Sequence, residues 1–426
     1  MPLCIFIEVT MMIFKNELKR FLHPVILVFL IIMSVLWYLI YMTNCNVYLD
    51  INAGMPYQIG KEYVQRFGTT IDNHEIEEIK KDYEVSKSEL NVLIKQSMGK
   101  YGIETIDEYQ DYFDKYYDIF TNQKSDDYNQ AIDKWGEEEY NRRAKIYDKI
   151  EEIYWKRNSP INNAAFKTQS IQAYIDEYNY LLDIKKAYKT NDDTYFFGNI
   201  TKQERQVLEN RLNKDEIAVG VGYIPLEENF VSYSRSWSLL IFICCAILII
   251  PMLIKNKLNN VVALQYSTKQ GKRILFNQLF AALSAGLLIS IILIFVFQLF
   301  YFKGDIIDFI NCPINLDTIS DLYWFDFTLL DYMICLWLKT ILLTISEILV
   351  LFWISYYGKN YVIAIAASVP IIILFHFISK SSNKFLHIFL GYPRFLYPQV
   401  IIVTIIITVM LSIIFLHKIK KADYLD

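Results

Sequence analysis

The chain has 426 residues, is 54% hydrophobic and carries a formal net charge of −4. The charge is unevenly distributed, because residues 43–236 hold 25 Lys or Arg and 35 Asp or Glu, whereas the remainder holds 17 basic and 11 acidic residues. An acidic central segment argues against nucleic-acid binding, which favours basic surfaces, and the six scattered cysteines offer no metal-ligand spacing.

Residues 1–42 are predicted to form an amphipathic helix followed by the first membrane span. In Met11–Leu22 the apolar residues share one helical face, and the basic residues can face water among lipid headgroups. Val25–Met42 carries no charge and is long enough to cross a bilayer, and the basic residues before it place the N-terminus in the cytoplasm. The residues expected to define this elbow helix are Phe14, Lys15, Leu18, Lys19 and Arg20.

Residues 43–236 are predicted to form a mainly helical extracellular domain. Asp72 is placed to cap its first helix, and the earliest strand pattern is Ile217–Tyr223. Aromatic residues at helical spacing are expected in the domain core, with a ligand-stacking surface as the alternative. Cys45 could pair with Cys312 of a later outer loop, and the spacing leaves that pairing open. The predicted helices are 71–98, 107–120, 128–155, 166–188 and 202–212.

Five further spans are predicted in residues 237–426. Each is an apolar run long enough for a membrane helix, and Thr328 with Asp331 forms a capping pair before one of them. The chain is therefore predicted to be an all-α membrane protein with six transmembrane helices, an N-terminal elbow helix and an extracellular domain between spans one and two. Six spans return the C-terminus to the cytoplasm. The five later spans are 237–254, 274–302, 329–357, 361–379 and 399–417.

The charges of the loops mostly support this topology. Residues 303–328 have a net charge of −4, as expected outside the cell, and the stretch after the last span is basic, as expected inside. Residues 380–398 run against the rule, because the basic side chains Lys380, Lys384 and Arg394 would lie outside. We retain the six-span topology because the other segments agree with it.

The loop of residues 255–273 is predicted to be cytoplasmic, because it holds five basic residues and no acidic one between two spans. Val261–Tyr266 fits a short amphipathic helix, which Ser267–Thr268 and Gly271 would end. We interpret the loop as a docking surface on which a partner could push. The alternative is a solvated loop that its lysines hold near lipid headgroups.

The sequence offers no recognisable catalytic constellation, but it places one carboxylate inside a predicted span. No Gly-x-x-x-x-Gly-Lys-Ser/Thr motif occurs, so P-loop ATPase activity is not expected on this chain. Glu347 lies in the apolar stretch Ile341–Phe352, where an unpaired carboxylate costs about 2–3 kcal/mol to insert. It either lines a substrate path or joins two helices through a polar contact. Lys339, earlier on the same predicted helix, does not stack directly on it.

Four stretches occur in an order that resembles a known family. They are the elbow MMIFKNELKRFLHP before the first span, the large insert ending in Phe230–Arg235, the basic loop LQYSTKQGKR, and the Ser355–Asn360 turn after the fourth span. Together with the topology, they resemble the membrane subunit of an ABC transporter of the second export type. The chain departs from that pattern at Lys269, where the family often has Pro, and at Asn259–Asn260, where an acidic residue is common.

This resemblance implies a permease that forms a homo- or heterodimer and recruits separate cytoplasmic ATPase subunits, which hold ATP and Mg²⁺. The loop of residues 255–273 would be the coupling helix, braced by the elbow helix, and Glu347 would be a candidate for the translocation path. The coupling residues that the resemblance implies are Leu264, Gln265, Tyr266, Ser267, Lys269, Gly271 and Arg273.

Two other functions remain open. The first is a non-transporting sensor or immunity protein whose extracellular domain binds a peptide. The second is a membrane enzyme, which the lack of an acid–base or metal cluster disfavours. The sequence does not specify the substrate. Its richness in Lys, Asn, Ile and Tyr suggests an AT-rich bacterial genome, so with six spans the chain is expected in a bacterial cell membrane.

Overall fold

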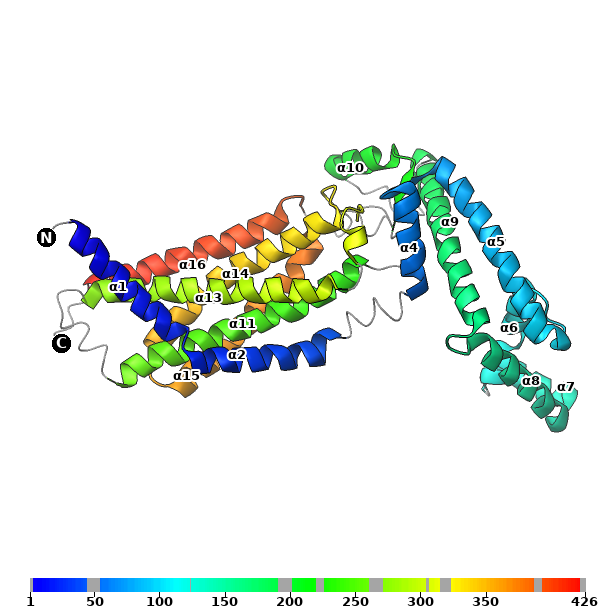
Figure 1. Ribbon diagram of the computed structural model, residues 1–426, viewed down its shortest axis with the longest axis horizontal. Helices are drawn as coiled ribbons and strands as arrows, with labels where there is room; N and C mark the ends of the chain where they lie inside the picture. Colours follow the sequence, from blue (N-terminus) through cyan, green and yellow to red (C-terminus); the bar gives the residue numbers. More distant parts are fainter. Residues whose placement is uncertain are drawn as a thin grey trace. The chain divides into compact units, whose positions relative to one another are not determined.

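The chain folds into two compact units, and nearly all of their regular structure is helical (Figure 1). One unit consists of Met1–Asn52 and Leu226–Asp426, and the other of Ala53–Pro225. The second unit falls within the segment that we predict to be extracellular. The computed structural model describes residues 3–43, 54–122, 124–190, 201–219, 226–259, 271–303, 306–314, 323–386 and 393–421.

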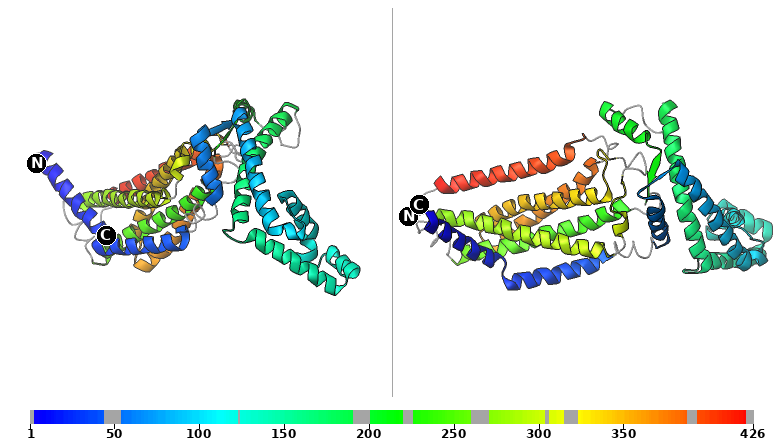
Figure 2. Two further views of the ribbon diagram at one scale, coloured as in Figure 1. Left: turned by 45° about the vertical axis from the view of Figure 1, so that its right-hand side comes forward. Right: turned by 45° about the horizontal axis from the view of Figure 1, so that its top comes forward.

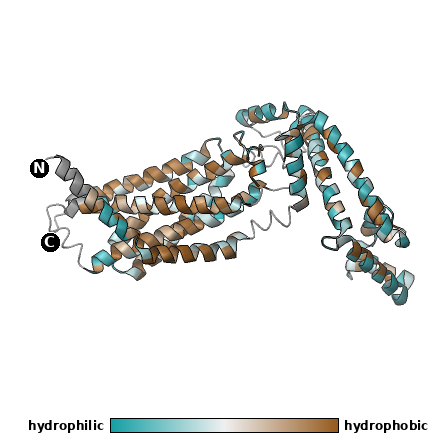
Figure 3. Cartoon of the chain, in the orientation of Figure 1, coloured by the Kyte–Doolittle hydropathy of each residue, from teal (hydrophilic) through white to brown (hydrophobic). Residues whose placement is uncertain are grey.

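The first unit contains, within its described residues, six helices that are long and apolar enough to span a membrane. Hydrophobic residues dominate all six (Figure 3), which confirms the prediction of an all-α membrane protein with six candidate spans. The helices are α2 (Pro24–Trp37, continued by the π-helical turn η1, Tyr38–Met42), α11 (Leu226–Leu258), α13 (Gly271–Tyr301), α14 (Leu329–Tyr357), α15 (Tyr361–Ser382) and α16 (Leu396–Lys421). Two 3-10 turns, η6 (Ile306–Phe309) and η8 (Asn383–Leu386), lie in the connections.

Helix α14 lies at the centre of this bundle, in contact with α11, α13, α15 and α16. Helix α11 is also well enclosed, with 72% of its most apolar window buried, whereas only 11% of the corresponding window of α2 is buried. Most of the apolar surface of α2 is therefore available to lipid.

Helix α11 begins at Leu226, eleven residues before the start that we predict for this span. The added turns bury polar groups that find partners on α13. Tyr301 donates its hydroxyl to Asn229 Oδ1 at 3.0 Å, and Tyr233 donates its hydroxyl to the carbonyl of Phe297 at 2.7 Å. The predicted span lies within this longer helix, because hydropathy marks only its apolar part and does not register polar side chains that are buried with hydrogen-bond partners.

Both ends of α14 are fixed by polar contacts. Thr328 Oγ1 accepts from the backbone N–H of Asp331 at 3.2 Å, and the Asp331 carboxylate accepts from the backbone N–H of Thr328 at 3.1 Å, which confirms the predicted capping pair. At the other end, Lys257 of α11 donates to the carbonyl of Gly358 at 3.2 Å. A cation there stabilises the carbonyl groups that the end of a helix leaves without partners.

The second unit is built on two long helices, α5 (Asn73–Met98) and α9 (Pro160–Thr190), which pack along each other (Figures 1 and 2). Ser86 and Thr168 share a buried hydrogen bond of 2.8 Å between their hydroxyl groups. The other helices are α4 (Gly54–Phe67), α6 (Ile106–Thr121), α7 (Asp126–Trp135), α8 (Glu137–Trp155) and α10 (Lys202–Leu212), with a 3-10 turn η3 (Gly99–Tyr101) after α5.

Aromatic side chains fill the core formed by α6 and α8, as predicted from their helical spacing. The rings of Tyr109 and Tyr154 stack with centroids 3.9 Å apart, and both side chains are buried. Tyr147 is buried beside them. Burial raises the pKa of Tyr154 to about 12, so this hydroxyl stays protonated at physiological pH.

Two strands form a short antiparallel sheet in this unit. Strand β1 (Thr70–Asp72) pairs with β2 (Glu216–Ala218), and Ile71 lies opposite Ile217. The strand pattern that we predict from Ile217 onward is confirmed where it overlaps β2, and residues 220–225 lie outside the described residues. The helix start that we predict at residue 71 is wrong, because Ile71 belongs to β1 and is buried.

One further expectation for this unit is wrong, and one helix was not predicted. The single helix predicted for residues 128–155 is two helices, because Gly136 adopts φ +78° and ends α7. Glycine reaches that conformation without the steric cost that a Cβ brings. Helix α4 is not among the predicted helices, and its Tyr63 packs edge-on against Tyr174 of α9 with ring centroids 5.1 Å apart.

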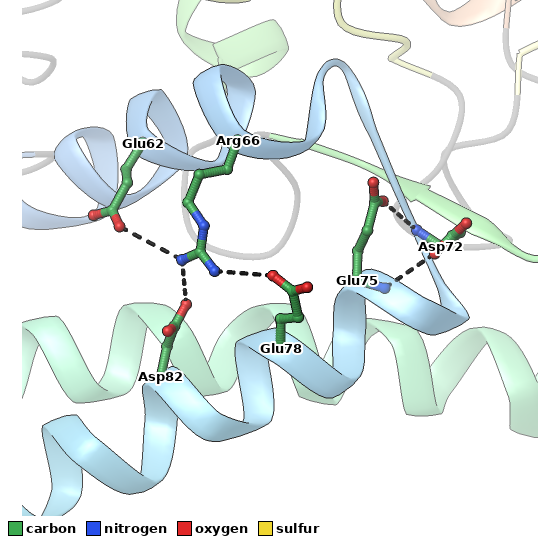
Figure 4. Close-up of polar contacts among 6 residues, drawn as sticks. All are labelled: Glu62, Arg66, Asp72, Glu75, Glu78 and Asp82. Carbon is green, nitrogen blue, oxygen red and sulfur yellow. Dashed lines mark hydrogen bonds and ion pairs between the residues drawn. The ribbon is translucent and has the colours of Figure 1, made fainter.

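Polar contacts join α4 to α5 (Figure 4). Asp72 Oδ1 accepts from the backbone N–H of Glu75 at 3.0 Å, and Glu75 Oε2 accepts from the backbone N–H of Asp72 at 2.9 Å, so the predicted cap is a full capping box. Arg66 of α4 forms ion pairs with Asp82 at 2.6 Å and with Glu78 at 3.2 Å on α5.

Replacing Asp72 by Ala is expected to loosen the first turn of α5. Loss of an N-cap costs about 1 kcal/mol, so the first amides of α5 should exchange with deuterium roughly fivefold faster. Hydrogen exchange on the full chain measures this. Glu84→Ala, which removes an exposed carboxylate from the middle of the same helix, is the control. Unchanged exchange in Asp72→Ala would contradict the role of the cap.

Candidate functional site

Helix α1 (Leu3–Phe21) packs against α13 and α11, the two spans that flank the basic loop. Phe21 is fully buried, and Phe14 and Leu18 are half-buried, whereas Lys15 and Lys19 are exposed. The burial follows the predicted amphipathic pattern only in part, because Met12 of the predicted apolar face is 59% exposed and Glu17 is buried. The apolar side of α1 packs against protein and is also open to surrounding lipid.

Arg20 corrects one part of the elbow prediction. We expect it to face water, but its Nη1 forms an ion pair with Glu17 Oε1 at 3.1 Å, and its Nη2 donates to Asn256 Oδ1 on α11. Glu17 is 6% exposed. The buried amide of Asn256 offers an acceptor, and Glu17, three residues earlier on the same helix, supplies the opposite charge. The i, i+3 spacing of Glu17 and Arg20 could have indicated this pair, but the partner on α11 could not be read from local sequence.

Only part of the predicted coupling loop can be placed. Gly271 is the first residue of α13, and Arg273 lies in its first turn. The other implied coupling residues, Leu264, Gln265, Tyr266, Ser267 and Lys269, lie outside the described residues.

The end of the bundle that carries the flanks of this loop is tied together by polar contacts. Lys257 near the end of α11 joins the end of α14, as described above, and Tyr361 at the start of α15 donates to the carbonyl of Pro251 on α11 at 3.5 Å. Arg20 links α1 to the same end of α11. A displacement of that end would therefore also move α1, α14 and α15.

Glu347 lies in the interior of the bundle, on the face of α14 that meets α11. It is fully buried, and neither carboxylate oxygen has a hydrogen-bond partner among the described residues. It lies close to the thiols of Cys244 and Cys245 of α11. Ser290 of α13 lies next to Cys245, with 3.9 Å between its Oγ and the cysteine Sγ. The hydroxyl of Ser290 is already used, since it donates to the carbonyl of Gly286 at 2.7 Å.

The surroundings of Glu347 are closely packed. A Cβ added at Gly286 of α13 would come within 2.4 Å of Ile348 Cδ1, so α13 and α14 approach closely beside the carboxylate. A buried carboxylate costs about 2–3 kcal/mol in a span if it stays unpaired. In this conformation Glu347 therefore occupies a costly position without a stabilising hydrogen bond from the described residues.

Lys339 belongs to a different part of α14. Its ammonium group donates to the carbonyl of Ser379 at 2.9 Å and to Asn383 Oδ1, so it faces α15 and the turn that follows. Glu347, by contrast, faces α11. The structure thus agrees with the expectation that the two charged residues do not stack on each other.

Two observations limit the chemistry of the described part of the chain. Within the described ranges, no group of three or more His, Cys, Asp or Glu residues could hold a metal ion. Cys312, for which we considered a disulfide, is a buried free thiol, and its candidate partner Cys45 lies outside the described residues.

No protein-family model, curated protein or solved structure matches this chain. Its assignment to a class therefore rests on its own residues. The fold defines an all-α multi-pass membrane protein with an inserted helical domain.

Proposed function

We propose that this chain is the permease subunit of an ATP-driven exporter in a bacterial cell membrane, working as a dimer with separate cytoplasmic ATPase subunits. The ATPases hold ATP and Mg²⁺, and the loop of residues 255–273 receives their motion. The N- and C-termini lie in the cytoplasm, and the helical unit Ala53–Pro225 lies outside the cell.

The observation that carries this proposal is the position of α1. This helix precedes the first span and contacts both α11 and α13, the helices on either side of the basic loop. Arg20 ties it to Asn256, a few residues before that loop. A brace at this position suits a loop that must transmit force, whereas a loop that only contacts headgroups has no need of one.

The contacts of the bundle suggest how such a force would travel. Closure of the ATPases would move the ends of α11 and α13, and both helices pack directly on the central helix α14. The close approach at Gly286 and Ile348 couples α13 to α14 beside Glu347. A shift between these helices would change the environment of that carboxylate, and we place the translocation path there.

Purification tests this function. The chain, tagged and isolated from its native cells in mild detergent, should carry a vanadate-sensitive ATPase activity in fixed stoichiometry with a second polypeptide. Isolation of the intact chain with no nucleotide hydrolysis, under conditions that preserve membrane complexes, would favour the peptide-binding sensor instead.

Cysteine labelling tests the topology. In a background without the native cysteines, Lys134→Cys on α7 should react with a membrane-impermeant maleimide in intact cells. Lys418→Cys near the end of α16 should react only after permeabilisation. Both side chains are exposed, so access depends on the side of the membrane. Labelling of Lys418→Cys in intact cells would contradict the six-span arrangement with both termini inside.

A further inference from the structure

Four basic side chains gather where α11, α14 and α15 meet: Arg235, Lys339, His376 and Lys380. Lys339 interacts electrostatically with Arg235, and His376 interacts with Lys380, Arg235 and Lys339. Lys339 is 3% exposed, His376 is half-buried and Lys380 is exposed, so the group runs from the bundle interior to its surface. We call these four residues the cationic cluster.

The end of α15 provides hydrogen-bond partners for only one of these four side chains. Lys339 donates to the carbonyl of Ser379 and to Asn383 Oδ1, which satisfies the C-terminal end of that helix. The Nε of Arg235, the Nδ1 of His376 and the Nδ2 of Asn383 are all buried and have no hydrogen-bond partner among the described residues. A buried N–H without a partner costs about 1–3 kcal/mol, so Arg235 Nε and Asn383 Nδ2 are two donors that an added acceptor would stabilise.

No carboxylate is among the described groups that act electrostatically on Lys339 and His376. The groups that act electrostatically on Lys339 and His376 are all basic. Of the nearby acids, Asp331 is held in the capping box of α14, Glu227 interacts with Tyr332, and Glu347 faces Cys244 and Cys245. A guanidinium stays charged in proteins, and a charge within a span is costly unless an anion pairs with it, so an anion from outside the described residues is expected beside Arg235.

The surface beside the cluster shows which anion fits. Phe377 and Ile373 are 63% and 61% exposed, and they lie on the same face of α15 as Lys380, at the spacing i, i+4 and i+7. Lys380 sits in the last turn of that helix. An acyl chain can lie along such an apolar face while its headgroup reaches the basic groups at the helix end. A small water-soluble anion would make no favourable contact with these two apolar side chains.

We propose that the cationic cluster binds the phosphate of an anionic phospholipid, whose acyl chain lies along Ile373 and Phe377. The planar guanidinium of Arg235 offers parallel N–H donors to two phosphate oxygens, and the amide of Asn383 adds another donor. Lys380 contacts the headgroup at the rim. Basic pockets between transmembrane helices bind headgroups in this way. The site belongs to the membrane-spanning unit alone and does not depend on the proposed transport function.

Native mass spectrometry of the full chain tests this site. The wild type should retain phosphatidylglycerol in preference to phosphatidylcholine. Arg235→Gln and Lys380→Gln should each weaken phosphatidylglycerol binding by about fivefold, the effect of one charge near a membrane surface. The matched control is Lys303→Gln, which removes an exposed cation at the end of α13 and outside the cluster, and should bind like the wild type. Unchanged phosphatidylcholine binding shows that the variants are folded.

Three outcomes would overturn the proposal. The first is equal retention of the two lipids, or variants that bind like the Lys303→Gln control. The second is displacement of phosphatidylglycerol by millimolar inorganic phosphate, which would assign the cluster to a free oxyanion. The third concerns Asp317 and Asp321, which lie outside the described residues. If only the Asp317→Asn/Asp321→Asn variant binds phosphatidylglycerol, the chain neutralises the cluster with its own carboxylates.

Discussion

Reversing Lys269 and Arg273 to Glu is expected to abolish the association of this chain with its ATPase while leaving the membrane-spanning unit folded. The loop of residues 255–273 contains five basic residues and no acidic one, so the double variant converts an attractive surface into a partly repulsive one. Opposite charges across an interface guide association, and like charges facing each other cost several kcal/mol. The readout is the ratio of ATPase to permease after affinity purification, which should fall below detection.

Two further variants make this test specific. Lys418→Glu changes an exposed lysine that follows the last span and should leave the ratio unchanged. Arg20→Gln keeps the loop intact but removes the ion pair with Glu17, so it should lower the coupling of ATP hydrolysis to transport more than it lowers association. An unaltered stoichiometry in the Lys269→Glu/Arg273→Glu variant would show that the ATPase docks elsewhere.

Replacing Glu347 by Leu is expected to stabilise the bundle and to abolish transport. The carboxylate is fully buried and makes no hydrogen bond to the described residues, so it contributes burial cost without a stabilising contact. Its removal should raise stability by about 2 kcal/mol. This expectation is the opposite of the one for a polar contact between two helices, in which Leu would weaken the assembly.

Glu347→Gln separates charge from shape. It retains the volume of the side chain but cannot ionise, so transport should fall at least tenfold if the path needs a carboxylate, which corresponds to about 1.4 kcal/mol. Thr344→Val, which removes a hydroxyl that bonds within its own helix, is the control on the same face of α14 and should remain active. Thermal unfolding and transport are measured on the same preparations. Wild-type transport by Glu347→Gln together with a destabilised Glu347→Leu would support a structural role.

Much of the fold could be predicted because its signals are local. A long apolar run identifies a span regardless of its neighbours, and the capping boxes at Thr328 and Asp72 depend on residues only three positions apart. The errors occur where tertiary contacts decide. Helix α4 has a weak local pattern and is held by Tyr63 against α9. The end of α7 at Gly136 could have been predicted, because a glycine within a charged helical stretch often ends a helix.

The candidate site was less predictable for the same reason. The burial of Glu347 followed from its apolar neighbours, but its lack of a hydrogen-bond partner among the described residues did not. The cationic cluster combines Arg235, Lys339 and His376 from three helices that are far apart in sequence, and no local pattern places them together. It also gives a reason for the charge of residues 380–398. Lys380 belongs to the cluster, and Arg394 lies over the rings of Phe325 and Phe395, so Arg394 has a local partner that the topology rule does not consider.

The length of α2 has a consequence for how this protein responds to its bilayer. With its π-helical turn, α2 runs from Pro24 to Met42, 19 residues, whereas α11 has 33 residues. At the helical rise, 19 residues cover about 28 Å, slightly less than the hydrocarbon thickness of an average bilayer. A thicker membrane would therefore strain α2 before the longer helices, which can tilt. Only Leu22 and His23 separate α2 from α1. Hydrophobic mismatch at α2 would therefore displace α1, which packs beside the basic loop. The thickness of the bilayer would in this way affect the conformation of that end of the protein.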